Sequence, residues 1–330
     1  MKNQLPDNPD VSLIVPVYNE QDNIAKLYSE IIESLNGVFK FEIIFIDDGC
    51  SDNSYSVLSE LYEKDERIRV IRFRRNFGQT AAMSAGFDCA KGEIIIPLDA
   101  DGQNDPADIP ALVEKLNEGY DIVSGWRKDR KDRTLTRKIP SMIANSIIGR
   151  CTGVKLHDYG CSLKAYKREV LDMINLYGEM HRFIPAIASW SGAKITEMVV
   201  NHRPRTAGVA KYGLERIIKV ILDLMTVKFL GSYSTKPIYI FGGLGFFSGF
   251  ASAIFGLIVL YMKYISPQHL SMNRNPLLIL SAILVITTVQ LILMGLLAEM
   301  IVRTYHESQH RPIYTIRNIL ERKAQSGDSI

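Results

Sequence analysis

Two aspartates separated by one residue, Asp99 and Asp101, follow a short apolar run at residues 94–98, and Gln103 continues the alternation. Carboxylate and amide oxygens suit hard cations such as Mg²⁺ or Mn²⁺, and proteins usually hold magnesium with one or two carboxylates plus substrate phosphates. A short acidic turn is the ordinary alternative for an Asp-x-Asp pair alone. The position directly after an apolar run favours a Mg²⁺ or Mn²⁺ site made by Asp99, Asp101 and Gln103.

A second acidic pair, Asp47 and Asp48, ends another apolar run and precedes Gly49. One of the two could simply cap the helix that is expected to begin near residues 51–53. In the other interpretation, Asp48 accepts a hydrogen bond from the base or ribose of a nucleotide while the glycine lets the backbone turn beside it. Tyr18 would then stack on the base or border it. The residues alone leave both interpretations open.

Short segments rich in valine and isoleucine predict the strands that carry these motifs, with amphipathic helical patterns such as 24–35 between them. Such strands, covered on both faces, form a mostly parallel α/β sheet, and ligands bind beyond the carboxyl ends of its strands. The acidic motifs and Arg127 fall at those ends. No GxGxxG or GxxxxGK[ST] pattern follows a predicted strand, which argues against a dinucleotide dehydrogenase or a P-loop enzyme. The predicted strands cover residues 11–17, 41–46, 68–73, 93–98 and 121–124.

Two stretches without charged residues, 238–262 and 277–298, each exceed the roughly 20 residues that a helix needs to cross a bilayer core. Helices buried in a soluble core are the alternative, but soluble helices of this length keep a polar face. Basic residues concentrate before the first stretch and after the second, and the polar N-terminus lacks a signal-sequence pattern. We therefore expect an integral protein of the plasma (inner) membrane with two transmembrane helices, and with its N-terminal domain and both termini cytoplasmic.

These patterns divide the chain into parts with different tasks. An apolar stripe with basic residues opposite it, along 214–230, predicts a helix lying on the membrane surface, although an ordinary domain helix can show the same pattern. Residues 311–323 predict a second surface helix. The expected parts are a cytoplasmic domain over 1–210, an interfacial amphipathic helix over 211–236, two transmembrane helices with a short outer loop over 237–300, and a cytoplasmic tail with a surface helix over 301–330.

Composition narrows the range of partners. The net charge of +3 is too small to favour nucleic acid, and basic residues near the spans suit anionic lipid head groups better. The four cysteines show no CxxC spacing and are expected to be free thiols. Gly245 and Gly249 allow close helix contact within the membrane, either between the two spans of one chain or in a homo-oligomer, of which a tetramer is one form.

The ordered set of motifs resembles the family 2 glycosyltransferases of the GT-A fold. It is most similar to the bacterial branch that makes polyprenyl-phosphate sugars, which includes polyisoprenyl-phosphate glucosyltransferases and undecaprenyl-phosphate 4-amino-arabinose transferase and is related to dolichyl-phosphate mannose synthase. Cys50 departs from the family pattern, in which serine usually follows Asp-Asp-Gly. The motifs are Val15-Pro16-Val17-Tyr18-Asn19-Glu20, Ile46-Asp47-Asp48-Gly49 with Ser51-Asp52-Asn53-Ser54, Asn76-Phe77-Gly78-Gln79, Leu98-Asp99-Ala100-Asp101-Gly102-Gln103 and His157-Asp158-Tyr159-Gly160-Cys161.

The resemblance implies a Rossmann-like GT-A domain that uses a divalent metal, a nucleotide-sugar donor and a polyprenyl-phosphate acceptor. It implies that the segment 203–213 closes over the donor and that Asp158 belongs to the active site. The residues that it places near the nucleotide are Pro16, Tyr18, Glu20, Asp48, Asn76, Gln79 and Asp99; those at the metal are Asp99, Asp101 and Gln103; those with a catalytic task are Arg127, Asp158, Arg205 and Lys211.

The role of Asp158 depends on the acceptor. Transfer to a hydroxyl needs a base, but a phosphate monoester has a second pKa of about 6 and is already a nucleophile at neutral pH. Asp158 could therefore act as a base or instead position the sugar or a basic residue such as Lys164. The expected reaction inverts the anomeric centre, with UDP-glucose as the first expected donor. UDP-4-amino-arabinose, GDP-mannose and UDP-N-acetylglucosamine are alternative donors, and a non-catalytic nucleotide-binding scaffold is the alternative function.

Overall fold

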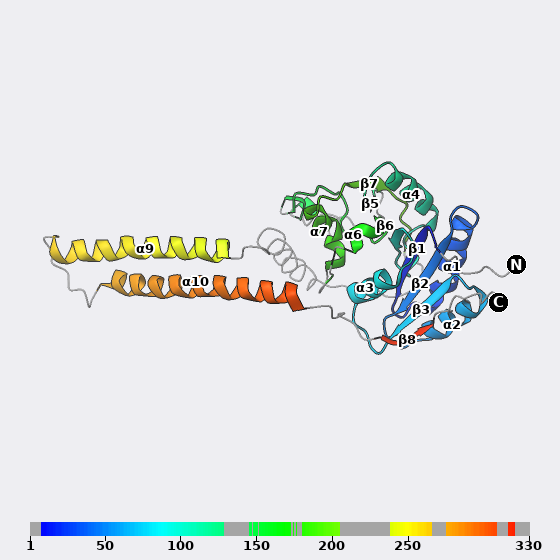
Figure 1. The fold of residues 1–330 in the computed structure, drawn as a ribbon, viewed down its shortest axis with the longest axis horizontal. Helices are drawn as coiled ribbons and strands as arrows, with labels where there is room; N and C mark the ends of the chain where they lie inside the picture. Colours follow the sequence, from blue (N-terminus) through cyan, green and yellow to red (C-terminus); the bar gives the residue numbers. More distant parts are fainter. Residues whose placement is uncertain are drawn as a thin grey trace, which may run out of the picture. The chain divides into compact units, whose positions relative to one another are not determined.

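A computed structural model describes the parts of the chain discussed below (Figure 1). Two compact units make up the chain: residues 1–227 with 312–330, and residues 228–311. Residues 205–213 of the segment predicted to close over the donor, and the predicted interfacial helix over 211–236, lie outside the described residues. The described residues are 8–128, 145, 146, 148–150, 152–172, 174, 176, 180–204, 238–265, 275–308 and 316–320.

The first unit is built around one mixed sheet with the strand order β7-β5-β6-β4-β1-β2-β3-β8. Strand β1 pairs in parallel with β2 and β4, and β3 extends the parallel part beside β2. All five strands predicted from the apolar runs are present, so the predicted α/β class is confirmed. The strands are β1 (Val11–Val17), β2 (Phe41–Asp47), β3 (Ile68–Phe73), β4 (Ile94–Pro97), β5 (Ile122–Trp126), β6 (Lys164–Lys167), β7 (Ile195–Val199) and β8 (Ile316–Leu320).

Helices follow most of the strands, and α1 shows why they pack where they do. Its apolar residues Ile24, Leu27, Ile31 and Leu35 recur at helical spacing and are all buried against the sheet. Each such side chain contributes about 1.5–3 kcal/mol when fully buried. The helices of this unit are α1 (Gln21–Leu35), α2 (Ser54–Lys64), α3 (Gln79–Cys89), η1 (Pro106–Asp108), α4 (Ile109–Asn117), α6 (Arg168–Leu171), η3 (Met180–Phe183) and α7 (Ile184–Trp190).

The C-terminal strand β8 corrects one prediction. A surface helix was expected over 311–323, but residues 316–320 pair antiparallel with β3, with Ile71 opposite Ile319. The edge of β3 would otherwise expose unpaired backbone groups, and a short segment containing two isoleucines can satisfy them as a strand. Helical spacing in so short a segment could not reveal this long-range pairing.

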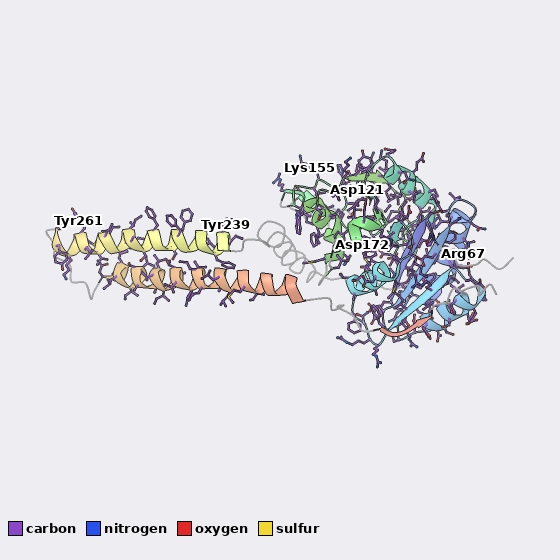
Figure 2. The ribbon with its side chains drawn as sticks, in the orientation of Figure 1. Arg67, Asp121, Lys155, Asp172, Tyr239 and Tyr261 are labelled. Atoms are coloured by element: carbon purple, nitrogen blue, oxygen red, sulfur yellow. The ribbon has the colours of Figure 1, made fainter. Side chains whose placement is uncertain are left out.

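The second unit is a pair of long apolar helices, α9 (Ile238–Tyr264) and α10 (Pro276–Ser308). Segments 239–264 and 276–298 are long and apolar enough to cross a membrane, as predicted, and Tyr239 and Tyr261 lie toward opposite ends of α9 (Figure 2). Ser252 donates a hydrogen bond to the carbonyl oxygen of Ser281 on α10 at 2.9 Å. A Cβ atom added at Gly245 would lie 3.2 Å from Ile292, so this face of α9 packs against α10 of the same chain.

Candidate active site

Asp48, at the carboxyl end of β2, organises the loop before α3. Its buried carboxylate accepts hydrogen bonds from the backbone N–H groups of Phe77 at 2.7 Å and Gly78 at 3.0 Å, and from Asn76 Nδ2 at 2.9 Å. Burial raises the pKa of Asp48 to about 6, although the two backbone hydrogen bonds act in the opposite direction. A Cβ atom at Gly49 would lie 2.4 Å from the carbonyl carbon of Arg75, so glycine is required where these two loops meet.

Neither aspartate of this motif caps a helix. Helix α2 begins at Ser54 with Asn53 as its N-cap residue, and Asp47 instead accepts a hydrogen bond from the backbone N–H of Cys50 at 2.7 Å. Asp47 also pairs with Arg72 Nε at 3.2 Å. The helix-cap interpretation of Asp47 and Asp48 is therefore wrong, and the motif forms a turn that points beyond the end of the sheet.

The loop after β1, which carries Tyr18 and Glu20, is held against this turn. Asn19 adopts a left-handed backbone with φ 54°, and its side-chain oxygen accepts a hydrogen bond from the backbone N–H of Ser51 at 2.8 Å. The backbone N–H of Asn19 donates to Cys50 Sγ at 3.2 Å. Burial raises the pKa of Cys50 to about 12, so its thiol stays protonated. Cys50 thus acts as a local hydrogen-bonding group, as the usual serine would.

Asp99, beyond the end of β4, is oriented from two sides. Gln79 Nε2 donates to its Oδ1 atom at 2.8 Å, and Ser162 Oγ donates to its Oδ2 atom at 2.5 Å. Asn104 Nδ2 in turn donates to Ser162 Oγ at 2.8 Å. Burial, together with the nearby charge of Asp101, raises the pKa of Asp99 to about 6.

The Asp99–Asp101 pair fits a divalent cation, because the charge of Asp101 opposes the ionisation of Asp99 and a bound cation would offset that effect. Asp101 is buried, and its Oδ1 atom accepts a hydrogen bond from the backbone N–H of Gln103 at 3.1 Å. Among the described residues, no group of three or more His, Cys, Asp or Glu side chains could hold a metal. The remaining ligands of Mg²⁺ or Mn²⁺ would therefore come from Gln103, water and the phosphates of a bound nucleotide.

Asp158 forms a two-pronged ion pair with Arg127, which follows β5. Arg127 Nε donates to Asp158 Oδ2 at 2.7 Å and Nη2 donates to Oδ1 at 3.0 Å, and both side chains are largely buried. Burial alone would lower the pKa of Arg127, but the pairing with Asp158 outweighs burial and raises it. Lys164 donates instead to the carbonyl oxygens of Tyr159 and Cys161. Asp158 thus holds the guanidinium of Arg127 in place.

The geometry gathers acidic and basic groups beyond the carboxyl ends of β1, β2, β4 and β5, and comparison with known proteins identifies the family. Residues 12–174 match the model of glycosyl transferase family 2. The chain is 42% identical over 326 residues to dodecaprenyl-phosphate galacturonate synthase of Rhizobium johnstonii, covering 96% of this chain and 95% of the relative. This chain is a family 2 glycosyltransferase.

Two further comparisons support the assignment. The glycosyltransferase is 36% identical over 312 residues to undecaprenyl-phosphate 4-deoxy-4-formamido-L-arabinose transferase of Edwardsiella ictaluri, covering 94% of each chain. Glucosyl-3-phosphoglycerate synthase from Mycobacterium tuberculosis, solved with Mn²⁺, UDP-glucose and phosphoglyceric acid, matches with a TM-score of 0.54 at 16% identity. That match covers 67% of this chain and 80% of the other chain, and it confirms the GT-A fold.

The structure brings together most of the residues that the sequence singled out in this glycosyltransferase. Asn76 contacts Asp48 and Gln79 contacts Asp99, so the segment 76–79 links the two acidic motifs. Pro16 lies in β1, with Tyr18 and Glu20 in the loop that follows. Arg205 and Lys211 lie outside the described residues, and their roles stay predictions.

Sequence reasoning missed Ser162 and Asn104, which orient Asp99. Ser162 directly follows the motif at residues 157–161, but neither residue belongs to a pattern that marks it as functional. Their role depends on contacts across 58 and 63 positions of the chain. The position of Ser162 directly after a motif is the sequence signal that could have indicated its role.

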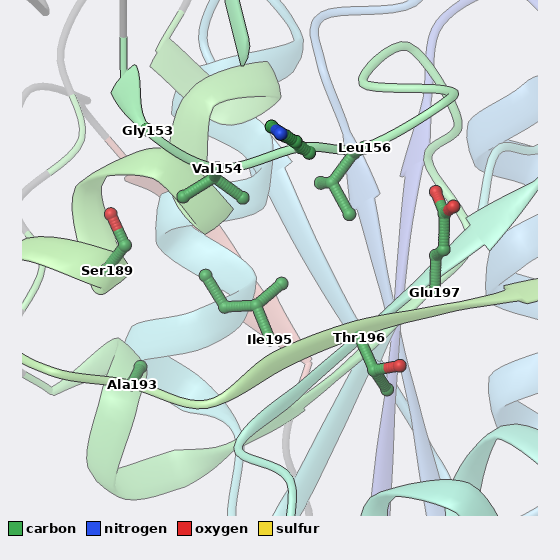
Figure 3. A pocket seen from close by; sticks show the side chains of 9 residues that line it. Gly153, Val154, Leu156, Ser189, Ala193, Ile195, Thr196 and Glu197 are labelled. Carbon is green, nitrogen blue, oxygen red and sulfur yellow. The ribbon is translucent and has the colours of Figure 1, made fainter. Parts of the chain in front are cut away.

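A separate pocket of about 380 Å³ shows that hollow shape alone does not locate the site. The open pocket lies beside β7 and contains none of the predicted catalytic, nucleotide or metal residues (Figure 3). Its lining includes Val154, Leu156, Ile195 and Glu197. The predicted site residues instead lie in the loops that carry Asp48, Asp99 and Asp158.

Proposed function

We propose that this glycosyltransferase transfers one sugar, with inversion, from a nucleotide-sugar to the phosphate of a polyprenyl lipid. The observation that carries the proposal is the ion pair between Asp158 and Arg127. A hydroxyl acceptor would need a base, yet this carboxylate is engaged by a guanidinium through both oxygens. A phosphate acceptor needs no such base, because it is largely ionised at neutral pH. The names of two relatives that match nearly the whole chain support the same acceptor.

The proposed reaction exchanges one bond to the anomeric carbon for another. A lipid phosphate oxygen attacks that carbon, the bond to the nucleoside diphosphate breaks, and its electron pair leaves with the diphosphate. Arg127, held in place by Asp158, supplies positive charge beside the reacting phosphates. Arg205 and Lys211 are proposed to add further charge. Attack from the face opposite the leaving group inverts the configuration.

A divalent metal would neutralise the charge that develops on the leaving diphosphate. Asp99 and Asp101, with Gln103, are the residues that we propose to hold it. Gln79 and Ser162 fix the orientation of the Asp99 carboxylate, so the ligand geometry exists before the nucleotide arrives. Either Mg²⁺ or Mn²⁺ suits this set of oxygen ligands.

The nucleoside is proposed to lie beside the loops after β1 and β2. Pro16, Tyr18 and Glu20 would border it from one side. Asp48 supports the site by fixing the backbone at Phe77 and Gly78. The same segment carries Asn76, which contacts Asp48, and Gln79, which contacts Asp99. This supporting role accounts for the hydrogen bonds of Asp48 better than a direct contact with the base does.

The sugar is the part of the proposal that relatives help to refine. The residues and the family resemblance led to UDP-glucose as the first expected donor, whereas the two relatives are named for galacturonate and for 4-deoxy-4-formamido-L-arabinose. We propose nucleotide-activated galacturonate as the donor to test first, because that relative shares 42% identity over almost the whole chain. UDP-glucose and the other donors stay predictions.

The proposed membrane topology has support from the chain's own connectivity. Helices α9 and α10 follow each other, and β8, which comes after α10, pairs with β3 of the catalytic domain. The chain therefore enters α9 from the catalytic domain and returns to that domain after α10. If both helices cross the bilayer, both flanks lie on one side, and the positive-inside rule makes that side cytoplasmic. The inner membrane would then carry the active site on its cytoplasmic face.

A donor panel tests the proposed function. Purified full-length protein in nanodiscs would be mixed with undecaprenyl phosphate, Mn²⁺ and one radiolabelled nucleotide-sugar at a time, and the lipid fraction would be extracted. We expect label in the lipid with one donor, galacturonate first, and none when undecaprenol without phosphate replaces the acceptor. Efficient labelling of the free alcohol would overturn the phosphate acceptor. Nucleotide binding without turnover for any donor would favour the non-catalytic scaffold.

A further inference from the structure

The segment that follows β7, residues 201–204, is fastened to the segment just after the Asp99–Asp101 turn. Asn201 donates to both carboxylate oxygens of Asp108, from its backbone N–H at 2.7 Å and from Nδ2 at 2.9 Å. The backbone N–H of Arg203 donates to the carbonyl oxygen of Gln103 at 2.9 Å. Two segments nearly a hundred residues apart in sequence therefore form one local structure beside the turn of residues 99–103, the metal turn.

The Arg203 side chain joins this structure to the body of the domain. Its Nη1 atom lies 2.8 Å from Glu30 Oε2 in α1, and its Nη2 atom lies 2.7 Å from Asp105 Oδ2. Asp105 also accepts a hydrogen bond from the backbone N–H of Ala107 at 3.1 Å, which starts the 3₁₀ helix η1. One guanidinium thus ties together α1, the residues after the metal turn and the segment 201–204.

The metal turn depends on such outside support. Within the turn, the hydrogen bond from the Gln103 backbone N–H to Asp101 is 3.1 Å long, and Gly102 has a φ of +70° that other residues rarely adopt. Asn104 and Ser162 support the turn on the side of Asp99. Arg203 contacts Gln103 through its backbone and Asp105 through its side chain, so it supports the turn on the side of Gln103.

We propose that Arg203 is a positioning residue that sets the affinity of the Asp99–Asp101–Gln103 site for its divalent metal. This inference rests on the proposed metal site and adds a residue that the sequence motifs do not assign to the metal. Arg203 does not touch the metal ligands with its side chain; it acts by fixing Gln103 and Asp105 relative to α1. Groups that orient metal ligands typically change metal affinity by about 10- to 100-fold when removed.

The exposure of the Arg203 side chain distinguishes a role in metal affinity from a contribution to the stability of the domain. The side chain of Arg203 is 36% exposed, and ion pairs at that exposure contribute little to the free energy of unfolding. Replacing Arg203 should therefore leave the domain folded while the turn loses its fixed position. Lysine carries one compact charge and cannot span Glu30 and Asp105 as the planar guanidinium does. Arg203→Lys should consequently keep only part of the effect.

The test measures Mn²⁺ binding by the loss of the free Mn²⁺ signal in electron paramagnetic resonance, with full-length protein in detergent and saturating UDP, after subtraction of the Mn²⁺ that the same UDP binds without protein. We expect Arg203→Ala to weaken Mn²⁺ binding by about tenfold or more, and Arg203→Lys to lie between that variant and the wild type. Lys115→Ala is the matched control, because it removes an ion pair with Glu118 on the exposed face of α4. The control should bind Mn²⁺ as the wild type does.

Other outcomes separate this inference from the proposed function. Equal Mn²⁺ affinity in wild type and Arg203→Ala would overturn the role of Arg203, whereas a wild type that binds no Mn²⁺ would overturn the metal site itself. Binding of UDP without metal should be the same in all variants, which a merely structural defect would not allow. If Arg203→Ala fails to fold, Glu30→Gln and Asp105→Asn each remove one of its ion pairs. Unchanged Mn²⁺ affinity in both would also contradict the inference.

Discussion

Asp65, at the amino end of the sheet, and Asp48 and Asp99, at the carboxyl end, are carboxylates with different hydrogen-bond donors. At the amino end, Asp65 is paired with Arg67 Nη2 at 2.7 Å and accepts a hydrogen bond from the Tyr28 hydroxyl at 2.8 Å (Figure 2 labels Arg67). At the carboxyl end, Asp48 and Asp99 accept their hydrogen bonds from backbone N–H groups, amides and a hydroxyl, which are neutral donors. Asp65 is thus held by a positively charged donor, whereas Asp48 and Asp99 are held by neutral donors; at the same carboxyl end, Asp47 and Asp158 pair with Arg72 and Arg127.

The pKa values follow this difference. Burial alone would raise the pKa of Asp65, but the hydrogen bonds from Arg67 and Tyr28 outweigh burial and lower it. Burial dominates at Asp48 and Asp99 and raises both pKa values to about 6, although Arg127 and Lys164 offset part of the effect at Asp99. The pairing of Asp65 thus serves the structure, whereas Asp48 and Asp99 keep raised pKa values of the kind that mark candidate functional sites.

The largest effect is expected at the carboxyl end. Asp101→Ala or Asp101→Asn should lower transfer by about a thousandfold, or about 4 kcal/mol of barrier, because each removes a charge that holds the metal. The unfolding temperature should stay close to that of the wild type. EDTA should reproduce the loss, and added Mn²⁺ should reverse it. Initial rates of lipid labelling measure the effect, and normal turnover in metal-free buffer would refute the metal assignment.

A change at the amino end should affect stability and not catalysis. Asp65→Asn leaves the buried Arg67 guanidinium without its charge partner, which costs about 3 kcal/mol of unfolding free energy. The lowered pKa of Asp65 means that its stabilising effect is present above the usual carboxyl pKa of about 3.9 and is lost as the pH falls below it. Asp65→Asn should therefore flatten that part of the pH–stability curve in thermal unfolding. A large drop in the turnover of the folded variant would contradict the comparison.

Packing in the membrane unit provides a smaller test. Gly245→Leu places a side chain where a Cβ atom alone would lie 3.2 Å from Ile292, so α9 and α10 must separate, at a cost of about 1–3 kcal/mol. Nucleotide binding by the catalytic unit should not change. Gly243→Leu is the matched control, because a Cβ atom there meets nothing within 4 Å. Helix proximity, measured by cross-linking of cysteine pairs across α9 and α10, should fall only in Gly245→Leu.

The smallest effect is expected at Cys50, beside the nucleotide loops. Serine can accept the hydrogen bond from the Asn19 backbone N–H and donate to the carbonyl oxygen of Val17, as the thiol does. Cys50→Ser should change transfer by less than about threefold, which corresponds to about 0.7 kcal/mol. Because the pKa of the Cys50 thiol is raised to about 12, iodoacetamide at pH 8 should label it very slowly in the folded protein. Rapid labelling in a mass-spectrometric time course would contradict this.

The sequence predicted the parts of the fold that depend on local pattern. Apolar runs located the central strands, helical spacing located the buried face of α1, and the position of the Asp-x-Asp motif after a strand located the acidic site. Features that depend on contacts between distant parts of the chain could not be predicted from local sequence patterns. Strand β8 depends on pairing with β3, Ser162 on its contact with Asp99, and Arg203 on its contact with Glu30, and the local sequence reveals none of these contacts.

The contacts of Asp158 that bear on its role in the mechanism could likewise not be predicted from its local sequence. Its motif indicated an active-site role, and the two-pronged contact with Arg127, which the motif does not reveal, favours a positioning group over a free base. A similar decision applies to Gly245, whose spacing allowed contacts within or between chains. In the structure it faces α10 of the same chain.

The products of the reaction test the central claim most directly. Transfer of the sugar alone to a lipid phosphate yields a phosphodiester and a nucleoside diphosphate, which phosphorus NMR distinguishes from other phosphate species. We predict a new phosphodiester signal that grows together with the nucleoside diphosphate, in a one-to-one ratio, in the wild type with Mn²⁺ but not in Asp101→Ala. A lipid diphosphate accompanied by nucleoside monophosphate would show transfer of a sugar phosphate instead, and would contradict the proposed reaction.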